Sequence, residues 1–210
     1  MTHGEAVLVQ GRLPFLLSLP RGGGKRPVLL FLHGYDEGAP LEIRAGLTRH
    51  GPLRPGSSLR AAEFIVVAPQ LPLRGDLWGR YAECVLEIVA RVHSVHQGDP
   101  RRTFLTGFSF GGNGVFDIAL RDPTVWSGLW GVDPTRVPEE DPGLPVWLSS
   151  GEVSRRRREG FMQRLALQPA GEGEPGRRVY SDDGLDHVGT ATAAYSSDRV
   201  YDWLLSLGKD

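Results

Sequence analysis

Short apolar runs alternate with longer segments of helical periodicity along this chain of 210 residues. Two runs, 28–33 (VLLFLH) and 64–68 (FIVVA), are continuously apolar, which is typical of strands buried on both faces of a sheet. The pattern predicts further strands at 7–9, 15–19, 102–107, 128–132, 146–150 and 178–181. It predicts helices at 79–96, 110–121, 159–167 and 197–207.

This alternation predicts an α/β fold, with a mostly parallel central sheet and helices on both faces. The first two strands are joined by a tight turn and indicate an antiparallel edge. No internal repeat and no linker interrupts the pattern, so residues 1–210 are predicted to form a single domain. The connection 34–63 is long and rich in Pro and Gly, and such connections often form a wall of a binding site.

The segment 103–114 (TFLTGFSFGGNG) contains the pattern Gly-x-Ser-x-Gly centred on Ser109. A serine on a sharp strand-to-helix turn takes a strained backbone, and small residues two before and two after it let strand and helix approach. Here an apolar strand precedes the pattern and an apolar-periodic helix follows it. We therefore predict that Ser109 is a nucleophile. The alternative is a glycine-rich turn with a solvent-facing serine.

A serine hydroxyl needs a general base to become a good nucleophile at neutral pH. Of the six histidines, only His187 follows Ser109, in a predicted loop between the last strand and the final helix. We predict that His187 is this base; the alternative is a histidine of a surface loop. Its neighbour Asp186 is predicted to cap or hydrogen-bond the same loop. His33 precedes the serine, and we interpret it as a structural ring.

Charge and composition exclude several classes of function. The chain has 24 basic and 25 acidic residues, which leaves no basic surface for nucleic acid. Four consecutive arginines, 155–158, are interpreted as a solvated helix face or loop rather than an anion site. The single cysteine, Cys84, allows no disulfide within the chain and no metal site built on thiolates, and it is predicted to be buried. The lack of a signal-peptide pattern and of about 18 consecutive apolar residues predicts a cytoplasmic protein with no stable membrane insertion.

Several segments together resemble the α/β-hydrolase superfamily, and most closely its compact bacterial esterases of the phospholipase/carboxylesterase-like or predicted-peptidase type. They are FLHGYDEG (31–38), RHGP (49–52), FIVVAPQ (64–70), DPRRTFLTGFSFGGNGVFDIALRDP (99–123) and AYSSDRVYDWLL (194–205). The resemblance covers most of the chain and implies a serine hydrolase without a metal or an organic cofactor. A cap domain usually enters after the sixth strand. Only residues 134–145 are available there, so no cap domain is expected.

The resemblance leaves the acid that orients the base open. Many members of the superfamily carry an aspartate three residues after the glycine that follows the next strand, and in this chain that position is Ser154. The segment GVDP (131–134) resembles the one that carries the acid in pancreatic-type lipases. We therefore favour Asp133, and Glu152 is the alternative because it follows the usual strand and has a longer reach. An Asp-Pro turn without catalytic role and a serine–histidine dyad are further alternatives.

In this superfamily, an amide from the loop after the third strand joins the amide after the nucleophile in holding the oxyanion. The matching donors are the backbone N–H groups of Tyr35 and Phe110. An open, mildly apolar cleft between 35–63 and 71–78 suits small-molecule esters with small to medium acyl chains. A thioesterase or peptidase with the same residues, and a binding protein that has lost catalysis, are the alternatives. The sequence leaves open whether the chain forms a homodimer.

Overall fold

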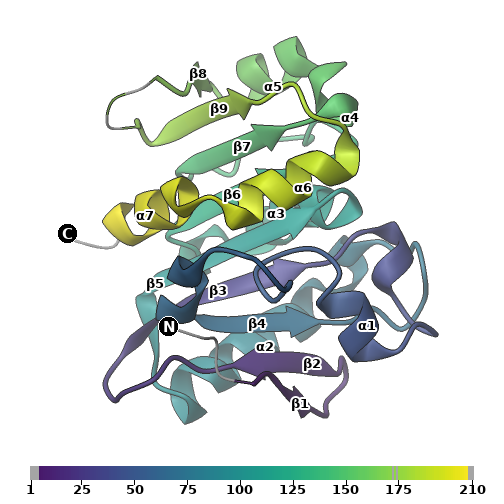
Figure 1. Cartoon of the computed structure of the whole chain (residues 1–210), viewed down its shortest axis with the longest axis vertical. Coiled ribbons are helices and arrows are strands. Elements are labelled where there is room, and N and C mark those ends of the chain that lie inside the picture. Colours follow the sequence, from purple (N-terminus) through teal and green to yellow (C-terminus); the bar gives the residue numbers. More distant parts are fainter. Residues whose placement is uncertain (1–4, 172, 174, 208–210) are drawn as a thin grey trace.

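The computed structural model describes residues 5–171, 173 and 175–207. Within these residues the chain forms one nine-stranded sheet of order β1-β2-β4-β3-β5-β6-β7-β9-β8, twisted through the middle of the molecule (Figure 1). The strands are β1 Val7–Val9, β2 Phe15–Ser18, β3 Arg26–Leu32, β4 Ile65–Pro69, β5 Gly98–Phe108, β6 Gly128–Val132, β7 Val146–Ser150, β8 Gln168–Pro169 and β9 Arg178–Asp182.

The sheet is parallel from β4 to β8, and its other edge is antiparallel. In the middle of the sheet, Leu30 of β3 lies beside Val67 of β4 and Leu105 of β5. All three side chains are fully buried, as expected for strands that are covered on both faces. Because the parallel strands share one direction, their carboxyl ends meet along a single edge of the sheet, where ligands bind in open α/β sheets.

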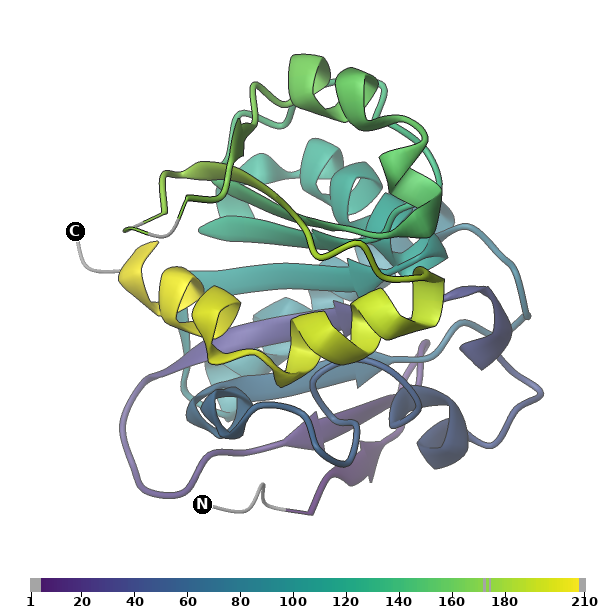
Figure 2. The same cartoon turned by 45° about the horizontal axis from the view of Figure 1, so that its top comes forward.

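Helices cover both faces of the sheet (Figure 2). The buried side chains of α2, α3 and α5 join one apolar cluster, and those of α1, α6 and α7 join a second cluster on the opposite face. The α-helices are α1 Ile43–Leu47, α2 Ala82–Val95, α3 Phe110–Arg121, α4 Glu152–Arg155, α5 Arg158–Arg164, α6 His187–Ser196 and α7 Asp198–Leu207; the 3-10 helices are η1 Tyr35–Glu37, η2 Leu59–Glu63, η3 Trp78–Tyr81 and η4 Pro123–Val125.

The predicted strands and helices are present, with some boundaries moved. The strand predicted at 102–107 is longer and begins at Gly98, and the helix predicted at 159–167 ends earlier, at Arg164. One strand and three α-helices were not predicted, namely α1, α4, β8 and α6, nor were the 3-10 helices η1, η2 and η4. The first three have five residues or fewer, too few for a periodic pattern to show. The prediction that His187 lies in a loop is therefore wrong, because this histidine is the first residue of α6.

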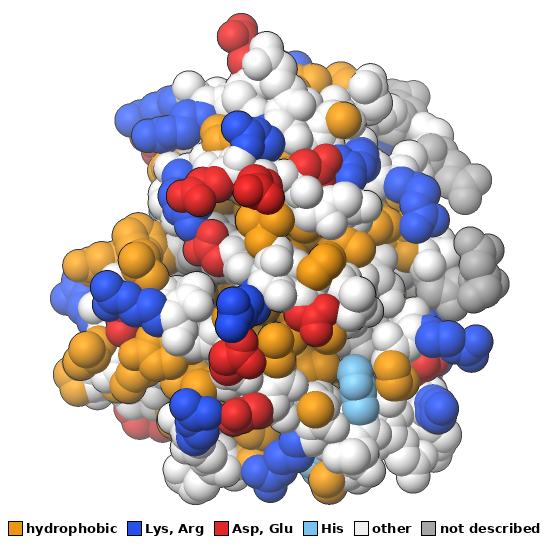
Figure 3. All heavy atoms as spheres, turned by 180° about the vertical axis from the view of Figure 1, so that it is seen from behind, with side chains coloured by type: hydrophobic (Ala, Val, Ile, Leu, Met, Phe, Trp, Pro, Cys, Tyr) orange, Lys and Arg blue, Asp and Glu red, His pale blue; other side chains and the backbone are white. Residues whose placement is uncertain are grey.

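Among the described residues, no cap domain covers the carboxyl edge of the sheet, as predicted. Residues 133–145, which connect β6 to β7, contain no helix and no strand. Cys84 is buried on α2, as expected, and none of the described helices could cross a lipid bilayer. On the face formed by α2 and α3, basic and acidic side chains are interspersed (Figure 3), which fits the near balance of charge in the sequence.

Candidate active site

Ser109 stands alone between β5, which ends at Phe108, and α3, which begins at Phe110. Its backbone has φ 57° and ψ −116°, a strained conformation for a residue with a side chain. The turn is possible because the flanking glycines let the backbones touch. A Cβ on Gly107 would lie 2.3 Å from the Gly111 carbonyl oxygen, and a Cβ on Gly111 only 1.9 Å from that of Leu32. The predicted spacing of small residues therefore has a direct steric cause.

The structure brings Ser109, His187 and Asp133 into one hydrogen-bonded chain. The Nε2 atom of His187 lies 2.9 Å from the Ser109 hydroxyl oxygen, and its Nδ1 atom lies 2.6 Å from Oδ2 of Asp133. His187 is held at the start of α6 by Asp186, whose carboxylate accepts the Gly189 N–H at 2.6 Å as the N-cap of that helix. The capping role predicted for Asp186 is thus confirmed.

Asp133 follows β6 directly and has no solvent exposure. Its φ of 40° is in the left-handed region, where Asp occurs more often than most residues other than glycine. Besides His187, the carboxylate accepts the N–H groups of Gly151 (2.9 Å) and Ser154 (2.8 Å) and the Ser154 hydroxyl (2.6 Å). Burial raises the pKa of this carboxyl, but these hydrogen bonds outweigh it and leave the pKa below its ordinary value. Asp133 is therefore ionised and fixed in one orientation.

Glu152, the alternative acid, makes no contact with the histidine among the described interactions. Its carboxylate points to solvent and pairs with Arg156 at 2.8 Å. Ser154, which stands where an acid was expected from the resemblance, instead donates to Asp133. The sequence did not predict that Ser154 supports Asp133, because a serine after a strand can have many roles. The only signal was that an acid was absent from that position.

Two further contacts fix the position of His187. Its ring packs against that of Phe108 with centroids 4.6 Å apart. The preceding loop is tied down by Arg155, whose guanidinium makes two 2.7 Å bonds to Asp182 and a third to the Leu185 carbonyl oxygen. The arginine run was predicted to be a solvated face, and Arg156 fits that description with its side chain 70% exposed. Arg155 has a structural role in addition.

A cavity of about 350 Å³ opens beside Ser109 and His187. Residues 71–78, predicted to form one side of the cleft, are not among those that line it; Leu71 and Trp78 are buried in the core instead. The lining residues are Gly34, Tyr35, Asp36, Glu37, Arg49, His50, Phe108, Ser109, His187 and Val188. The wall opposite the serine is thus more polar than the sequence indicated.

No family model matches the chain, and no curated protein matches it. Solved structures do match. A thermostable esterase superposes with a TM-score of 0.72 at 19% identity, over 96% of this chain and 62% of its own, so this chain spans less than two thirds of that esterase. S-formylglutathione hydrolases from Staphylococcus aureus (TM-score 0.68, 14% identity, 97% and 96% covered) and Agrobacterium tumefaciens (0.64, 13%, 100% and 98%) also match. The chain has the α/β-hydrolase fold. The resemblance drawn from the sequence is confirmed at this level.

In an α/β-hydrolase fold the oxyanion donors come from the residue after the nucleophile and from the loop after β3. Phe110 and Tyr35 occupy these two places, each as the first residue of a helix, where the backbone N–H has no partner within the helix. Their rings meet edge to face at 5.0 Å, so the two segments are in contact. His33, interpreted from the sequence as a structural ring, is 1% exposed and bonded to the backbone on both ring nitrogens.

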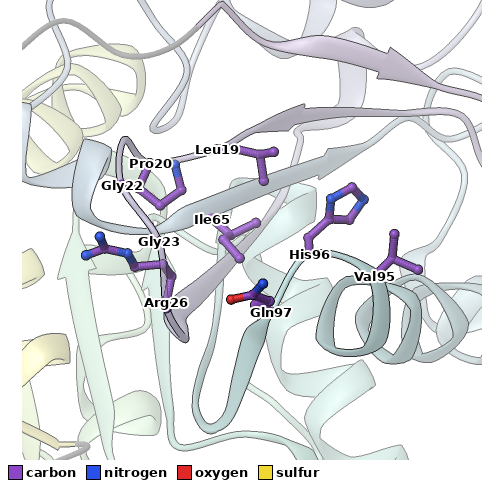
Figure 4. Close-up of a pocket in the computed structure, with 10 residues that line it drawn as sticks. Leu19, Pro20, Gly22, Gly23, Arg26, Ile65, Val95, His96 and Gln97 are labelled. Carbon is purple, nitrogen blue, oxygen red and sulfur yellow. The ribbon is translucent and has the colours of Figure 1, made fainter.

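Besides a small hollow of about 130 Å³ between β2 and α2, two larger hollows lie away from these residues. One of about 240 Å³ sits at the opposite end of the sheet, between the start of β3 and the end of α2, with His96 and Gln97 on its wall (Figure 4). The other is lined by the arginines of 155–158 and by Val137. Among the described residues, no group of three or more His, Cys, Asp or Glu side chains is placed to hold a metal ion. Neither of these two hollows is lined by Ser109, Asp133 or His187.

Proposed function

We propose that this chain is a serine hydrolase that cleaves carboxylic esters of small to medium acyl chain. The observation that supports this most strongly is the continuous chain of hydrogen bonds from Asp133 through His187 to Ser109, beside an open cavity. A serine on a strained turn, a histidine within reach of its hydroxyl and a buried carboxylate on the far ring nitrogen form the arrangement that activates a serine toward acyl groups.

The proposed reaction has two halves. The Ser109 oxygen attacks the ester carbonyl carbon while His187 Nε2 takes the hydroxyl proton, and the negative charge on the carbonyl oxygen is held by the N–H groups of Tyr35 and Phe110. The C–O bond to the alcohol then breaks, and His187 returns the proton to the departing oxygen. Water, deprotonated by the same histidine, next attacks the acyl-serine; the bond to the Ser109 oxygen breaks, His187 returns the proton to that oxygen, and the carboxylic acid leaves.

The size of the cavity supports short to medium acyl chains. A volume of about 350 Å³ is at the lower end of the range for ligand pockets. Its apolar part, formed by Phe108, Tyr35 and Val188, offers a modest surface for an alkyl group.

Thioesters are a second candidate substrate class. Two of the similar solved structures are S-formylglutathione hydrolases, named for a thioester substrate. The same steps would transfer the acyl group from sulfur, and a thiolate leaves more readily than an alkoxide. Turnover of matched oxygen and sulfur esters of one acyl group would separate the two classes.

Hydrolysis of p-nitrophenyl butyrate by the wild-type chain and by Ser109→Ala tests the proposal. We expect Ser109→Ala to lose nearly all turnover, by at least about 10³-fold. Ser94→Ala is the matched control, because Ser94 is an exposed serine on α2 whose hydroxyl bonds only the Arg91 carbonyl. A fluorophosphonate probe should label the wild type and not Ser109→Ala. An unlabelled wild type without turnover would refute the proposal.

A further inference from the structure

The wall of the cavity that faces Ser109 contains a buried carboxyl group that the proposed mechanism does not use. It belongs to Glu37, the last residue of η1, and only 5% of its side chain is exposed. Asp and Glu side chains are rarely buried this far unless they are paired. Burial raises the pKa of the Glu37 carboxyl, while the charge of Arg49 acts in the opposite direction.

Glu37 and Ser109 approach each other across Gly34. A Cβ on Gly34 would lie 2.8 Å from Oε2 of Glu37 and 3.5 Å from Cβ of Ser109. The glycine therefore leaves open the space between the carboxyl group and the serine. Glu37 and Ser109 line the same cavity, so a substrate bound there has Glu37 in its surroundings.

The Glu37 carboxylate accepts hydrogen bonds from the backbone N–H groups of Gly34 and Glu37, and a carboxylate with about four acceptor positions can take a further donor. Arg49 and His50 each place a nitrogen 3.7 Å from Oε1, which is longer than a hydrogen bond. Burial, aided by the nearby positive charges, lowers the pKa of His50 to about 4, so this ring is neutral near pH 7. The His50 ring also packs on Phe108 at 4.9 Å, which places it in the same wall as the residues around Ser109.

We infer that Glu37 forms a polar subsite that selects ester substrates bearing a hydroxyl group close to the reacting carbonyl, an inference that rests on the proposed esterase function. A hydroxyl fits because it both donates and accepts, so it satisfies the carboxyl in either protonation state. A substrate carboxylate would face Glu37 and Asp36, and a substrate ammonium would face Arg49. An unsubstituted alkyl chain would cover the carboxyl without offering it a hydrogen bond, which is costly.

The hydroxyl can belong to the acyl group or to the alcohol, and two pairs of esters distinguish these sources. The acyl pair is p-nitrophenyl 3-hydroxybutyrate against p-nitrophenyl butyrate. The alcohol pair is 2-hydroxyethyl butyrate against propyl butyrate, measured by acid release. In at least one pair, the wild type should prefer the hydroxylated ester by about tenfold in kcat/KM, the size expected for one hydrogen bond to a charged group.

Two variants at position 37 assign the preference to this side chain. Glu37→Gln keeps a donor and an acceptor and should retain most of the preference, whereas Glu37→Leu should lower kcat/KM for the hydroxylated ester relative to the unsubstituted one and so abolish the preference. Arg49→Ala is the control at the cavity mouth and should keep the preference. The inference is overturned if the wild type shows no preference in either pair, or if Glu37→Leu lowers both esters of a pair equally. Should Glu37→Leu fail to fold, Glu37→Met provides the same comparison. If no ester is turned over at all, the proposed function itself fails.

Discussion

The hydroxyl of Ser154 donates a 2.6 Å hydrogen bond to the buried carboxylate of Asp133. The two residues follow neighbouring strands, Asp133 after β6 and Ser154 in the first turn after β7. The carboxylate thus follows the strand next to the one that the resemblance suggested. Ser154, at the suggested position, donates its N–H and its hydroxyl to that carboxylate. Substitutions of Asp133 and of Ser154 should therefore have different effects.

Asp133→Asn should lower kcat for p-nitrophenyl butyrate by about 10³–10⁴-fold. An amide in place of the carboxylate would no longer hold the imidazole with Nδ1 protonated, nor stabilise its charged form. Glu152→Gln should stay within about twofold of the wild type, because Glu152 only pairs with Arg156 at the surface. A large loss of activity in Glu152→Gln and a small one in Asp133→Asn would instead assign the acid role to Glu152.

Ser154→Ala should lower the unfolding free energy by about 1.5–3 kcal/mol, because a buried carboxylate loses one charge-assisted donor. It should also lower kcat/KM by about tenfold, since the carboxylate becomes freer to turn away from His187. Urea denaturation and steady-state kinetics measure the two effects. Ser149→Ala is the matched control: this buried serine bonds Trp130 Nε1 rather than the carboxylate, so its variant should lose stability and keep activity.

Some parts of the fold and of the site could be predicted from the sequence, and others could not. The strands β3 and β4 and the turn at Ser109 were predictable, because continuous apolar runs and fixed glycine spacing are local signals. α6 was not, because its sequence HVGTATAAYS spreads small side chains around the helix and gives no apolar stripe. The choice of acid was also beyond local signals, since it depends on which carboxylate meets a histidine 54 residues away.

The polar wall was missed for a similar reason. Glu37, Arg49 and His50 lie in a connection without apolar periodicity, and only the folding of that connection over the strand ends places them opposite Ser109. Nothing in their spacing along the chain predicts that they meet.

Stability should fall as the pH drops below 6.5, in part because of His33. Its Nε2 accepts the Leu71 N–H at 3.0 Å and its Nδ1 lies 2.7 Å from the Gly34 carbonyl oxygen, so the buried ring is neutral. Burial lowers the pKa of His33 to about 4, from about 6.5 in the unfolded chain. Between these values the unfolded chain binds more protons, so acid favours unfolding. We expect His33 to contribute a loss of about 2 kcal/mol between pH 7 and pH 5.

Urea denaturation of His33→Gln at both pH values checks this assignment. The variant should be less stable at pH 7, where it lacks the ring, yet should lose less stability than the wild type on acidification. The slope will not vanish, because His50 has a pKa lowered to about 4 and acts in the same direction. Identical pH slopes for variant and wild type would show that His33 does not titrate in this window.

Gly111→Ala should destabilise the fold by several kcal/mol, because its Cβ would lie 1.9 Å from the Leu32 carbonyl oxygen and neither backbone can yield cheaply. Gly23→Ala, where a Cβ meets nothing within 4 Å, should stay within about 0.5 kcal/mol of the wild type. Thermal denaturation of the two variants measures the difference. Equal melting temperatures would mean that β3 and α3 are not in such close contact.

The short connection between β6 and β7 has a consequence for the fate of a covalent intermediate. With only residues 133–145 there, the part of the chain that the structure describes has no cap after β6 to move aside before a small molecule enters the cavity beside Ser109. For the proposed acyl-enzyme, a dissolved alcohol therefore competes directly with water at the same carbonyl carbon. In methanol–water mixtures the proportion of methyl ester among the products should rise with the methanol concentration, and the protein would then act as an acyltransferase.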